Sequence, residues 1–290
     1  MKQRISNWFE EKLDSLELRR APSLPKQIHL SITDRCFLPC LHCDIWKNDT
    51  VDLSSDIWLS VIDRLGKWCA PGSINFVGGE TLLCKDLEKL ISHAVSYGFE
   101  TSFNTNGWLV TQKRAEALAK AGTKTAYVSL DGFDKKTVDH SRGRAGSYEK
   151  AHEAISFFQE HANIQVVIAT ILHTQNASQM VPMLRWAHQN HIQMVIQPLY
   201  QNFGNNVYNR DWWKTSDFWP HTSEEQDELK SVLDALVTEK ERGMPLLNDP
   251  RQLQAMQFHF QHPSVDSGLS CRAGHSDLSF DPQGNIRLCY

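Results

Sequence analysis

The chain has 290 residues, a formal net charge of −4 and 41% hydrophobic residues. These values are those of an ordinary globular protein and exclude fibrous, collagen-like and wholly disordered chains. A chain of this length buries roughly 75% of the surface that it exposes when unfolded, so it needs no stabilising disulfides. The slightly acidic balance argues against non-specific binding to nucleic acid.

The N-terminal segment contains no targeting signal. Met1–Pro22 has neither an apolar core nor a small-residue cleavage site. No apolar run in the chain approaches the roughly 20 residues of a membrane span. The spacing of Ile5, Trp8 and Leu16 predicts an amphipathic helix within residues 1–25. We therefore expect a cytoplasmic protein that does not enter a membrane.

Strand-like and helix-like segments alternate through the first two thirds of the chain, and each gap between strands is long enough for a parallel crossover. Right-handed crossovers would curl six such units into an α/β fold, a partial (β/α)6 TIM-like barrel. The predicted strands are Ile28–Thr33, Ile74–Val77, Thr101–Asn104, Ala126–Leu130, Ile164–Leu172 and Gln193–Pro198. The predicted helices between them are Ser54–Cys69, Lys85–Tyr97, Gln112–Ala121, Ser147–His161 and Ser178–Asn190.

The character of the chain changes after the sixth strand. Tyr200–Trp219 is rich in aromatic residues, and helices are predicted at Ser223–Arg242 and Pro250–Phe260. The aromatic segment is either a lid that excludes water from a site or a hydrophobic seam between two parts of the protein. The predicted division is an N-terminal helix (1–25), a barrel (26–221), a helical linker (222–262) and a small C-terminal extension (263–290).

Three cysteines crowd into the loop after the first strand, as Cys36-x3-Cys40-x2-Cys43. In a reducing compartment such spacing favours a metal centre over disulfides. Tetrahedral zinc needs four ligands, and His42 is too close to Cys43 to be a good fourth. Three thiolates suit a four-iron cluster that leaves one iron open for a ligand. The alternatives are a structural zinc knuckle and three unrelated thiols.

Polar motifs also follow the next three strands. Gly78-Gly79-Glu80 follows the second strand, Asn104 ends the third, and Ser129-Leu130-Asp131 ends the fourth. In β/α barrels the C-terminal ends of the strands carry the active site. The sequence therefore predicts one site at this end of the barrel.

A cysteine triad after the first strand of six β/α units, followed by Gly-Gly-Glu after the second, resembles the radical S-adenosylmethionine (SAM) superfamily. The resemblance implies that Cys36, Cys40 and Cys43 hold a four-iron four-sulfur cluster. It also implies that the open iron binds the amino and carboxylate groups of SAM. One electron would then cleave SAM to a 5′-deoxyadenosyl radical, which abstracts hydrogen from a substrate.

The resemblance also implies roles for the residues at the strand ends. The Gly-Gly-Glu motif binds the methionine amino group, and the family often has proline where this chain has Thr81. Polar residues at the end of the fourth strand bind the ribose. The arginine of His140-Ser141-Arg142-Gly143 pairs with the SAM carboxylate or is simply solvated. The candidate SAM-binding residues are Gly78, Gly79, Glu80, Asn104, Ser129, Asp131 and Arg142. Weaker candidates near adenine are His42, Ile168, Thr170 and Gln197.

The C-terminal cysteines are similar to the opening of a SPASM or twitch extension. Cys271 and Cys289 frame Cys-x12-Gly-x4-Cys around a predicted hairpin turn at 281–285. The resemblance implies an auxiliary iron–sulfur cluster, but two thiolates do not fill a site that needs four. Cys69, Cys84 and His275 are poor additional ligands. We therefore expect either a fragment of a longer protein, which we favour, or a degenerate site.

The resemblance implies a radical SAM oxidoreductase of the maturase type, acting in peptide maturation or small-molecule biosynthesis. Its partners would be the substrate and an electron donor such as flavodoxin or ferredoxin, with neither nucleic acid nor membrane. The alternative is a non-catalytic iron–sulfur or zinc protein that keeps the barrel for binding. An intact glycine pair and Glu80 weigh against that alternative. The sequence does not identify the substrate.

Overall fold

The computed structural model describes residues 24–201, 209–265 and 273–287. One sheet organises this part of the chain, in the order β6-β5-β4-β3-β2-β1-β7-β8. Its strands are β1 (Gln27–Thr33), β2 (Ser73–Gly78), β3 (Glu100–Thr105), β4 (Thr125–Ser129), β5 (Gln165–Leu172), β6 (Gln193–Pro198), β7 (Asp277–Phe280) and β8 (Ile286–Arg287). The helices are α2 (Ser55–Cys69), α3 (Leu87–Ser96), α4 (Gln112–Ala121), α5 (Lys135–Ser141), α6 (Ser147–Gln159), α7 (Met180–Gln189), α8 (Ser223–Glu241) and α9 (Pro250–Gln261).

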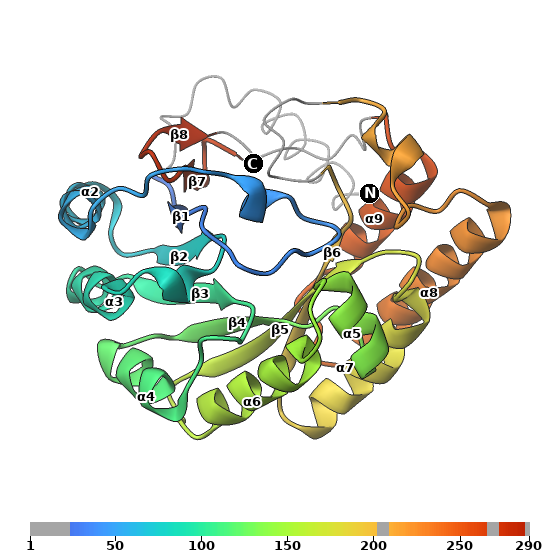
Figure 1. The fold of residues 1–290 in the computed structure, drawn as a ribbon, viewed down its shortest axis with the longest axis horizontal. Coiled ribbons are helices and arrows are strands. Elements are labelled where there is room, and N and C mark those ends of the chain that lie inside the picture. The colour runs from blue at the N-terminus through green and yellow to red at the C-terminus, as the bar shows by residue number, and fades with distance from the viewer. Residues whose placement is uncertain (1–23, 202–208, 266–272, 288–290) are drawn as a thin grey trace, which may run out of the picture.

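Strands β1 to β6 are parallel and lie in an arc with helices on its outer side (Figure 1). The order of the strands is linear, and among the described strands the two ends of the sheet do not pair with each other. This is the open (β/α)6 barrel that the sequence predicted. All six predicted barrel strands are present, and the bounds of β6 and α4 are those expected.

The two faces of strands β1 to β3 carry different side chains. Apolar side chains on the outer face pack beneath the helices, and polar side chains lie on the inner face. Leu30 on β1 is paired in register with Phe76 on β2, and both are fully buried in the core beneath the helices. Successive residues of a strand point to opposite faces, so His29 and Asn75, paired one position earlier, face inward. Both are only partly buried, and Ser102 on β3 donates a 3.0 Å hydrogen bond to Asn75. At these positions of β1, β2 and β3 the interior is therefore lined by polar groups.

The structure contains one helix and one strand pairing that were not predicted from the sequence. Helix α5 is a short addition after β4, capped by the Asp134 side chain, which accepts from the Thr137 N–H. The expected C-terminal hairpin is present, with the Gly284 N–H donating 2.8 Å to the Asp281 carbonyl in its turn. The sequence did not indicate that β7 of this hairpin pairs in parallel with β1 and so extends the barrel sheet. The predicted N-terminal helix lies mostly in residues 1–23, outside the described residues.

The aromatic segment after β6 combines both interpretations offered by the sequence. Trp219 is 1% exposed and packs on Trp212 and on Phe260 of α9, so it forms a seam with the following helices. The adjacent Phe218 contacts the rings of His42 and His173 at the carboxyl ends of the strands. In the described part of the segment, residues 209–219, Trp219 therefore forms a seam and Phe218 covers the two histidines of the candidate site.

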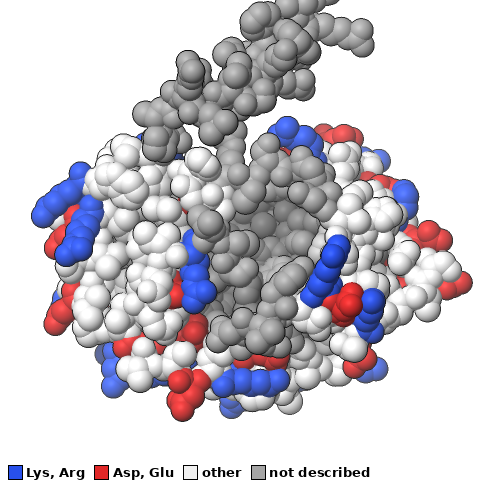
Figure 2. Space-filling view, turned by 90° about the horizontal axis from the view of Figure 1, so that it is seen from above, with Lys and Arg blue, Asp and Glu red and all other residues white. Residues whose placement is uncertain are grey.

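The described surface has charges of both signs. Figure 2, seen from above the view of Figure 1, shows Lys and Arg interspersed with Asp and Glu around the margin of that face. Within the described residues no helix combines the length and the apolar character needed to cross a membrane.

Candidate functional site

The cysteine triad lies in the loop between β1 and a short 3-10 turn at Ile45–Lys47. Cys40 is buried, Cys36 and Cys43 are half-buried, and none of the three is in a disulfide. Burial raises the pKa of all three thiols, that of Cys43 to about 11. A metal ligand must be deprotonated, and a bound metal would itself supply the positive charge that keeps these thiols ionised.

The Gly78-Gly79 pair holds this loop in place. The Gly79 N–H donates 2.7 Å to the Thr33 carbonyl, and the Glu80 N–H donates 2.9 Å to the Arg35 carbonyl. A Cβ on Gly79 would lie 2.3 Å from the Arg35 carbonyl oxygen, and Gly78 has φ +136° with its Cβ position 2.0 Å from the Thr33 oxygen. The resemblance places these two glycines in the motif that binds the methionine amino group. In the structure the backbone that approaches them is the cysteine loop itself.

The Glu80 carboxylate turns into the protein. It is fully buried, and Oε1 accepts from Thr105 Oγ1 at 2.8 Å and from the Leu82 N–H at 3.1 Å. Oε2 accepts from the Asn106 N–H at 2.7 Å. Burial raises the pKa of Glu80. The three hydrogen bonds favour the charged carboxylate and lower the pKa, but burial is the larger effect. Within the protein, these contacts join the ends of β2 and β3.

Asp131 and Arg142, expected to contact different parts of SAM, pair with each other. Arg142 Nη2 lies 2.6 Å from Oδ2 of the fully buried Asp131, and the Ile171 N–H donates 3.0 Å to Oδ1. Burial alone would raise the pKa of Asp131, but the Arg142 guanidinium holds it below its usual value. A carboxylate this deeply buried requires a charged partner, which explains the pairing.

Two nitrogen donors lie next to sulfur atoms of the triad. Asn106 Nδ2 is 3.9 Å from Cys36 Sγ, and Arg142 Nη1 is 4.0 Å from Cys40 Sγ. Asn106 lies two residues after Asn104, the predicted end of the third strand, and no role was predicted for it from the sequence.

A pair of histidines completes the site. The side chain of His42 is 6% exposed and Nε2 lies 3.7 Å from Asp131 Oδ2. His173, directly after β5, has its ring centroid 6.4 Å from that of His42. Burial lowers the pKa of His42 to about 4 and that of His173 to about 3, so both rings are neutral near pH 7. The sequence analysis missed His173, although its position at a strand end is the signal it used elsewhere.

Several buried polar atoms at this end of the barrel have no hydrogen-bond partner among the described residues. Each such atom carries a desolvation cost of about 1–3 kcal/mol, which a polar ligand would relieve. They are His42 Nδ1, His173 Nε2, Arg142 Nε and Asn104 Oδ1. Ser129, half-buried, lies nearby at the end of β4.

The other candidates are dispersed. Ile168 is buried in the core, Thr170 donates 2.7 Å to the Leu130 carbonyl, and Gln197 is exposed. Cys69 is buried at the end of α2, which agrees with the structural role favoured for it. Cys271 and Cys289 lie outside the described residues.

In the described part of the chain, no three His, Cys, Asp or Glu side chains, the cysteine triad included, are already gathered around one point as ligands of a single metal ion.

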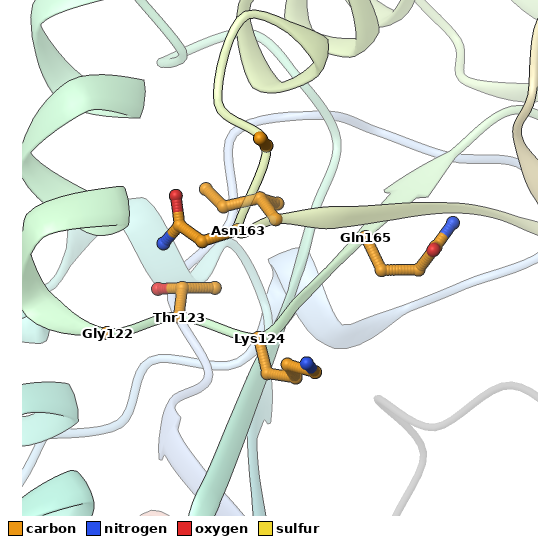
Figure 3. A pocket seen from close by; sticks show the side chains of 7 residues that line it. Gly122, Thr123, Lys124, Asn163 and Gln165 are labelled. Atoms are coloured by element: carbon orange, nitrogen blue, oxygen red, sulfur yellow. The ribbon is translucent and has the colours of Figure 1, made fainter.

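A surface pocket lies at the opposite end of the strands (Figure 3). It is lined by residues 122–124, before β4, and by residues 162–165, which lead into and include the first residue of β5. Asp131 and His173 follow the other ends of the same two strands, so this pocket is separate from the candidate site.

The fold and the site define an open β/α barrel with a cysteine loop and polar groups gathered at the carboxyl ends of its strands. The Radical SAM superfamily matches residues 30–187, more than half of the chain. The chain therefore belongs to the radical SAM superfamily.

Known proteins of similar sequence include PqqA peptide cyclase of Rhodopseudomonas palustris, with 29% identity over 53% of this chain and 41% of that protein. Mycofactocin maturase MftC of Mycolicibacterium smegmatis is 25% identical over 99% of this chain and 67% of its own length. The crystal structure of Streptococcus suis SuiB bound to S-adenosylmethionine has the same fold, with a TM-score of 0.70, 16% identity and coverage of 97% of this chain and 64% of SuiB. The chain thus spans about half the length of the first curated relatives it matches.

Radical SAM proteins use a four-iron four-sulfur cluster and SAM. The residues present fit these groups. Three free thiols share one loop, two nitrogen donors face their sulfur atoms, and unpartnered polar atoms lie beside them.

Proposed function

We propose that this chain forms the radical-generating part of a radical SAM enzyme that acts on a peptide substrate. The observation that carries the proposal is the loop with three free thiols at the carboxyl end of β1, with nitrogen donors directed at two of its sulfur atoms. The superfamily supplies the reaction class, and the relatives suggest the class of substrate.

In this proposal Cys36, Cys40 and Cys43 are the cluster ligands. When bound, the cluster and SAM supply a 5′-deoxyadenosyl radical that takes a hydrogen atom from the substrate. The chain's own residues hold the ligands in place: the glycine pair packs against the cysteine loop, and Glu80 fixes the neighbouring strand end.

The remaining candidate residues have different proposed roles. Asn104 and Ser129 offer polar side chains to SAM directly, because the Asn104 amide oxygen has no hydrogen-bond partner in the described region. Asp131 acts through Arg142, whose Nε is also unpartnered and suits a carboxylate. The non-catalytic alternative has no support from these observations.

A peptide substrate is consistent with the interior of the barrel. Its inward-facing side chains include His29, Asn75 and Ser102, which are polar and only partly buried. Peptides present many backbone N–H and C=O groups, for which such side chains are suitable partners. The names of PqqA peptide cyclase and mycofactocin maturase point to the same class.

The proposal extends to the C-terminal segment and to the partners. Residues 263–290 would begin an auxiliary-cluster extension, with Cys271 and Cys289 as two of its ligands. We keep the predicted domain boundaries, at about residue 221 between the barrel and the linker and at about residue 262 between the linker and the extension. A low-potential donor such as flavodoxin or ferredoxin would supply electrons in a reducing cytoplasm, where free thiols persist.

The experiment is anaerobic reconstitution with iron and sulfide, followed by addition of SAM and dithionite and quantification of 5′-deoxyadenosine. The proposal predicts product well above a control without protein. It also predicts loss of the cluster and of product in Cys40→Ala, but not in Cys69→Ala, which removes a buried thiol from α2. Equal product from both variants would contradict the assignment of the triad.

A further inference from the structure

Two side chains outside the cysteine loop point N–H groups at its sulfur atoms. A buried carboxylate contacts each of the two residues, at the backbone N–H of Asn106 and at the guanidinium of Arg142. We propose that Asn106 and Arg142 are positioning residues that donate hydrogen bonds to Cys36 and Cys40 and thereby set the reduction potential of the cluster. This inference rests on the cluster assignment in the proposed function. It concerns the chain's own contacts with the cysteine sulfurs.

The orientation of Asn106 is fixed by two hydrogen bonds. Its backbone N–H donates 2.7 Å to Glu80 Oε2, and its side-chain Oδ1 accepts from the Trp108 N–H at 3.0 Å. Because Oδ1 is engaged, the amide presents Nδ2 to Cys36 Sγ, at 3.9 Å. Asn106 is 8% exposed, so this donor is shielded from water.

Arg142 follows helix α5 and bridges two groups. Its Nη1 lies 4.0 Å from Cys40 Sγ, and its Nη2 lies 2.6 Å from Asp131 Oδ2. Arg142 is 9% exposed and Asp131 is fully buried. The planar guanidinium thus reaches the thiolate and the carboxylate at once.

The charge of each residue determines whether it raises or lowers the reduction potential of the cluster. Reduction adds one negative charge to the cluster, and hydrogen bonds to the cysteine sulfurs are known to tune its potential. The Arg142 cation and the Asn106 N–H stabilise the reduced form and raise the potential. The Asp131 anion opposes this, and burial leaves these effects poorly screened by salt.

The test is a potentiometric titration of the reconstituted protein without SAM, monitored by electron paramagnetic resonance. Dithionite supplies one electron to each cluster and is itself oxidised, and no atom is transferred. Arg142→Met and Asn106→Leu are expected to shift the midpoint potential to more negative values. Asp131→Asn is expected to shift it to more positive values, because Arg142 then lacks its counter-charge.

Because Arg142→Met and Asp131→Asn are expected to shift the midpoint potential in opposite directions, the measurement distinguishes an electrostatic role from a structural one. Loosening the fold would lower cluster content in every variant but would not move the potential in opposite directions for the two members of one ion pair. Arg142→Lys keeps the charge and is expected to stay closer to wild type than Arg142→Met. Arg185→Met, which breaks a 2.6 Å ion pair with Glu239 between α7 and α8, is the matched control and should leave the potential unchanged.

The inference is overturned if Arg142→Met and Asp131→Asn shift the potential in the same direction, or if neither shifts it. If Arg142→Met does not fold, the sign of the shift in Asp131→Asn and the shift in Asn106→Leu decide the question. Iron and sulfide analysis of the wild-type protein separates this failure from a failure of the proposed function. A wild type that binds no cluster refutes the function, whereas a cluster with unshifted variants refutes only this inference.

Discussion

The backbone N–H of Asn106 donates a 2.7 Å hydrogen bond to Oε2 of Glu80, although the two residues are 26 positions apart. The bond joins the end of β3 to the end of β2. The same carboxylate accepts from Thr105 Oγ1, so a single buried side chain orders the turn that carries Asn106. Glu80 therefore acts on the site through the backbone.

Glu80→Gln tests this role. Glutamine has an amide NH2 where the carboxylate has an acceptor, so one of the donors from Thr105, Asn106 or Leu82 loses its partner. We expect the free energy of unfolding to fall by about 1–3 kcal/mol, measured by urea denaturation. A variant with unchanged stability but weakened SAM binding would show instead that the carboxylate contacts the ligand.

The second prediction concerns the packing of the cysteine loop on Gly79. In Gly79→Ala the new Cβ would lie 2.3 Å from the Arg35 carbonyl, so the loop must move away from β2. We expect the iron content after reconstitution to fall several-fold. Gly98→Ala is the control, because Gly98 has nothing within 4 Å of its Cβ position and bears only the strain of φ +86°. That variant should lose about 1 kcal/mol of stability and keep its iron.

The barrel could be predicted from the sequence because its signals are local. Strands such as β6 and helices such as α4 follow their own hydrophobic periodicity, and the structure gives both the expected bounds. Helix α5 escaped prediction because it is short and buries only Val138 and Ser141, which leaves no periodic apolar face. The pairing of β7 with β1 joins segments some 250 residues apart, and no local pattern encodes it.

The site was predicted by position but not by contact. The motifs at the strand ends do gather at one edge, as parallel strands require. Their partners depend on burial, which the sequence does not reveal. Asp131, for which the resemblance implied a contact with the ribose, is fully buried, and nothing in the sequence indicated that it pairs with Arg142.

The third prediction concerns acid stability and His173. Burial lowers the pKa of His173 from 6.5 to about 3. Between these two pH values His173 is therefore protonated in the unfolded chain but neutral in the folded chain. Stability should therefore fall as the pH decreases from 6.5 toward 3. The contribution of this one group is about 1.4 kcal/mol per pH unit.

His173→Asn isolates that contribution. The Asn side chain keeps an acceptor for the Gln175 N–H, which now donates to His173 Nδ1. Between pH 6 and 4.5, urea denaturation should show a shallower loss of stability in the variant than in the wild type. The same substitution at His188, which is exposed on α7, should leave the slope unchanged. Parallel slopes for His173→Asn and wild type would refute the assignment.

The fourth prediction concerns Phe218, whose ring packs on His42 and His173. Phe218 is 5% exposed, and its ring centroid lies 4.6 Å from that of His173. Since burial is the largest cause of the lowered pKa, removal of the ring should admit water and raise the pKa of His173 toward its ordinary value.

Phe218→Ala should therefore shift the His173 titration upward in histidine NMR spectra, besides losing about 3–5 kcal/mol of stability. Phe158→Ala is the matched control, because Phe158 is fully buried on α6 and packs against Phe103. It should lose similar stability without moving the His173 titration. An unmoved titration in Phe218→Ala would mean that the barrel wall, and not the aromatic segment, keeps water from the histidines.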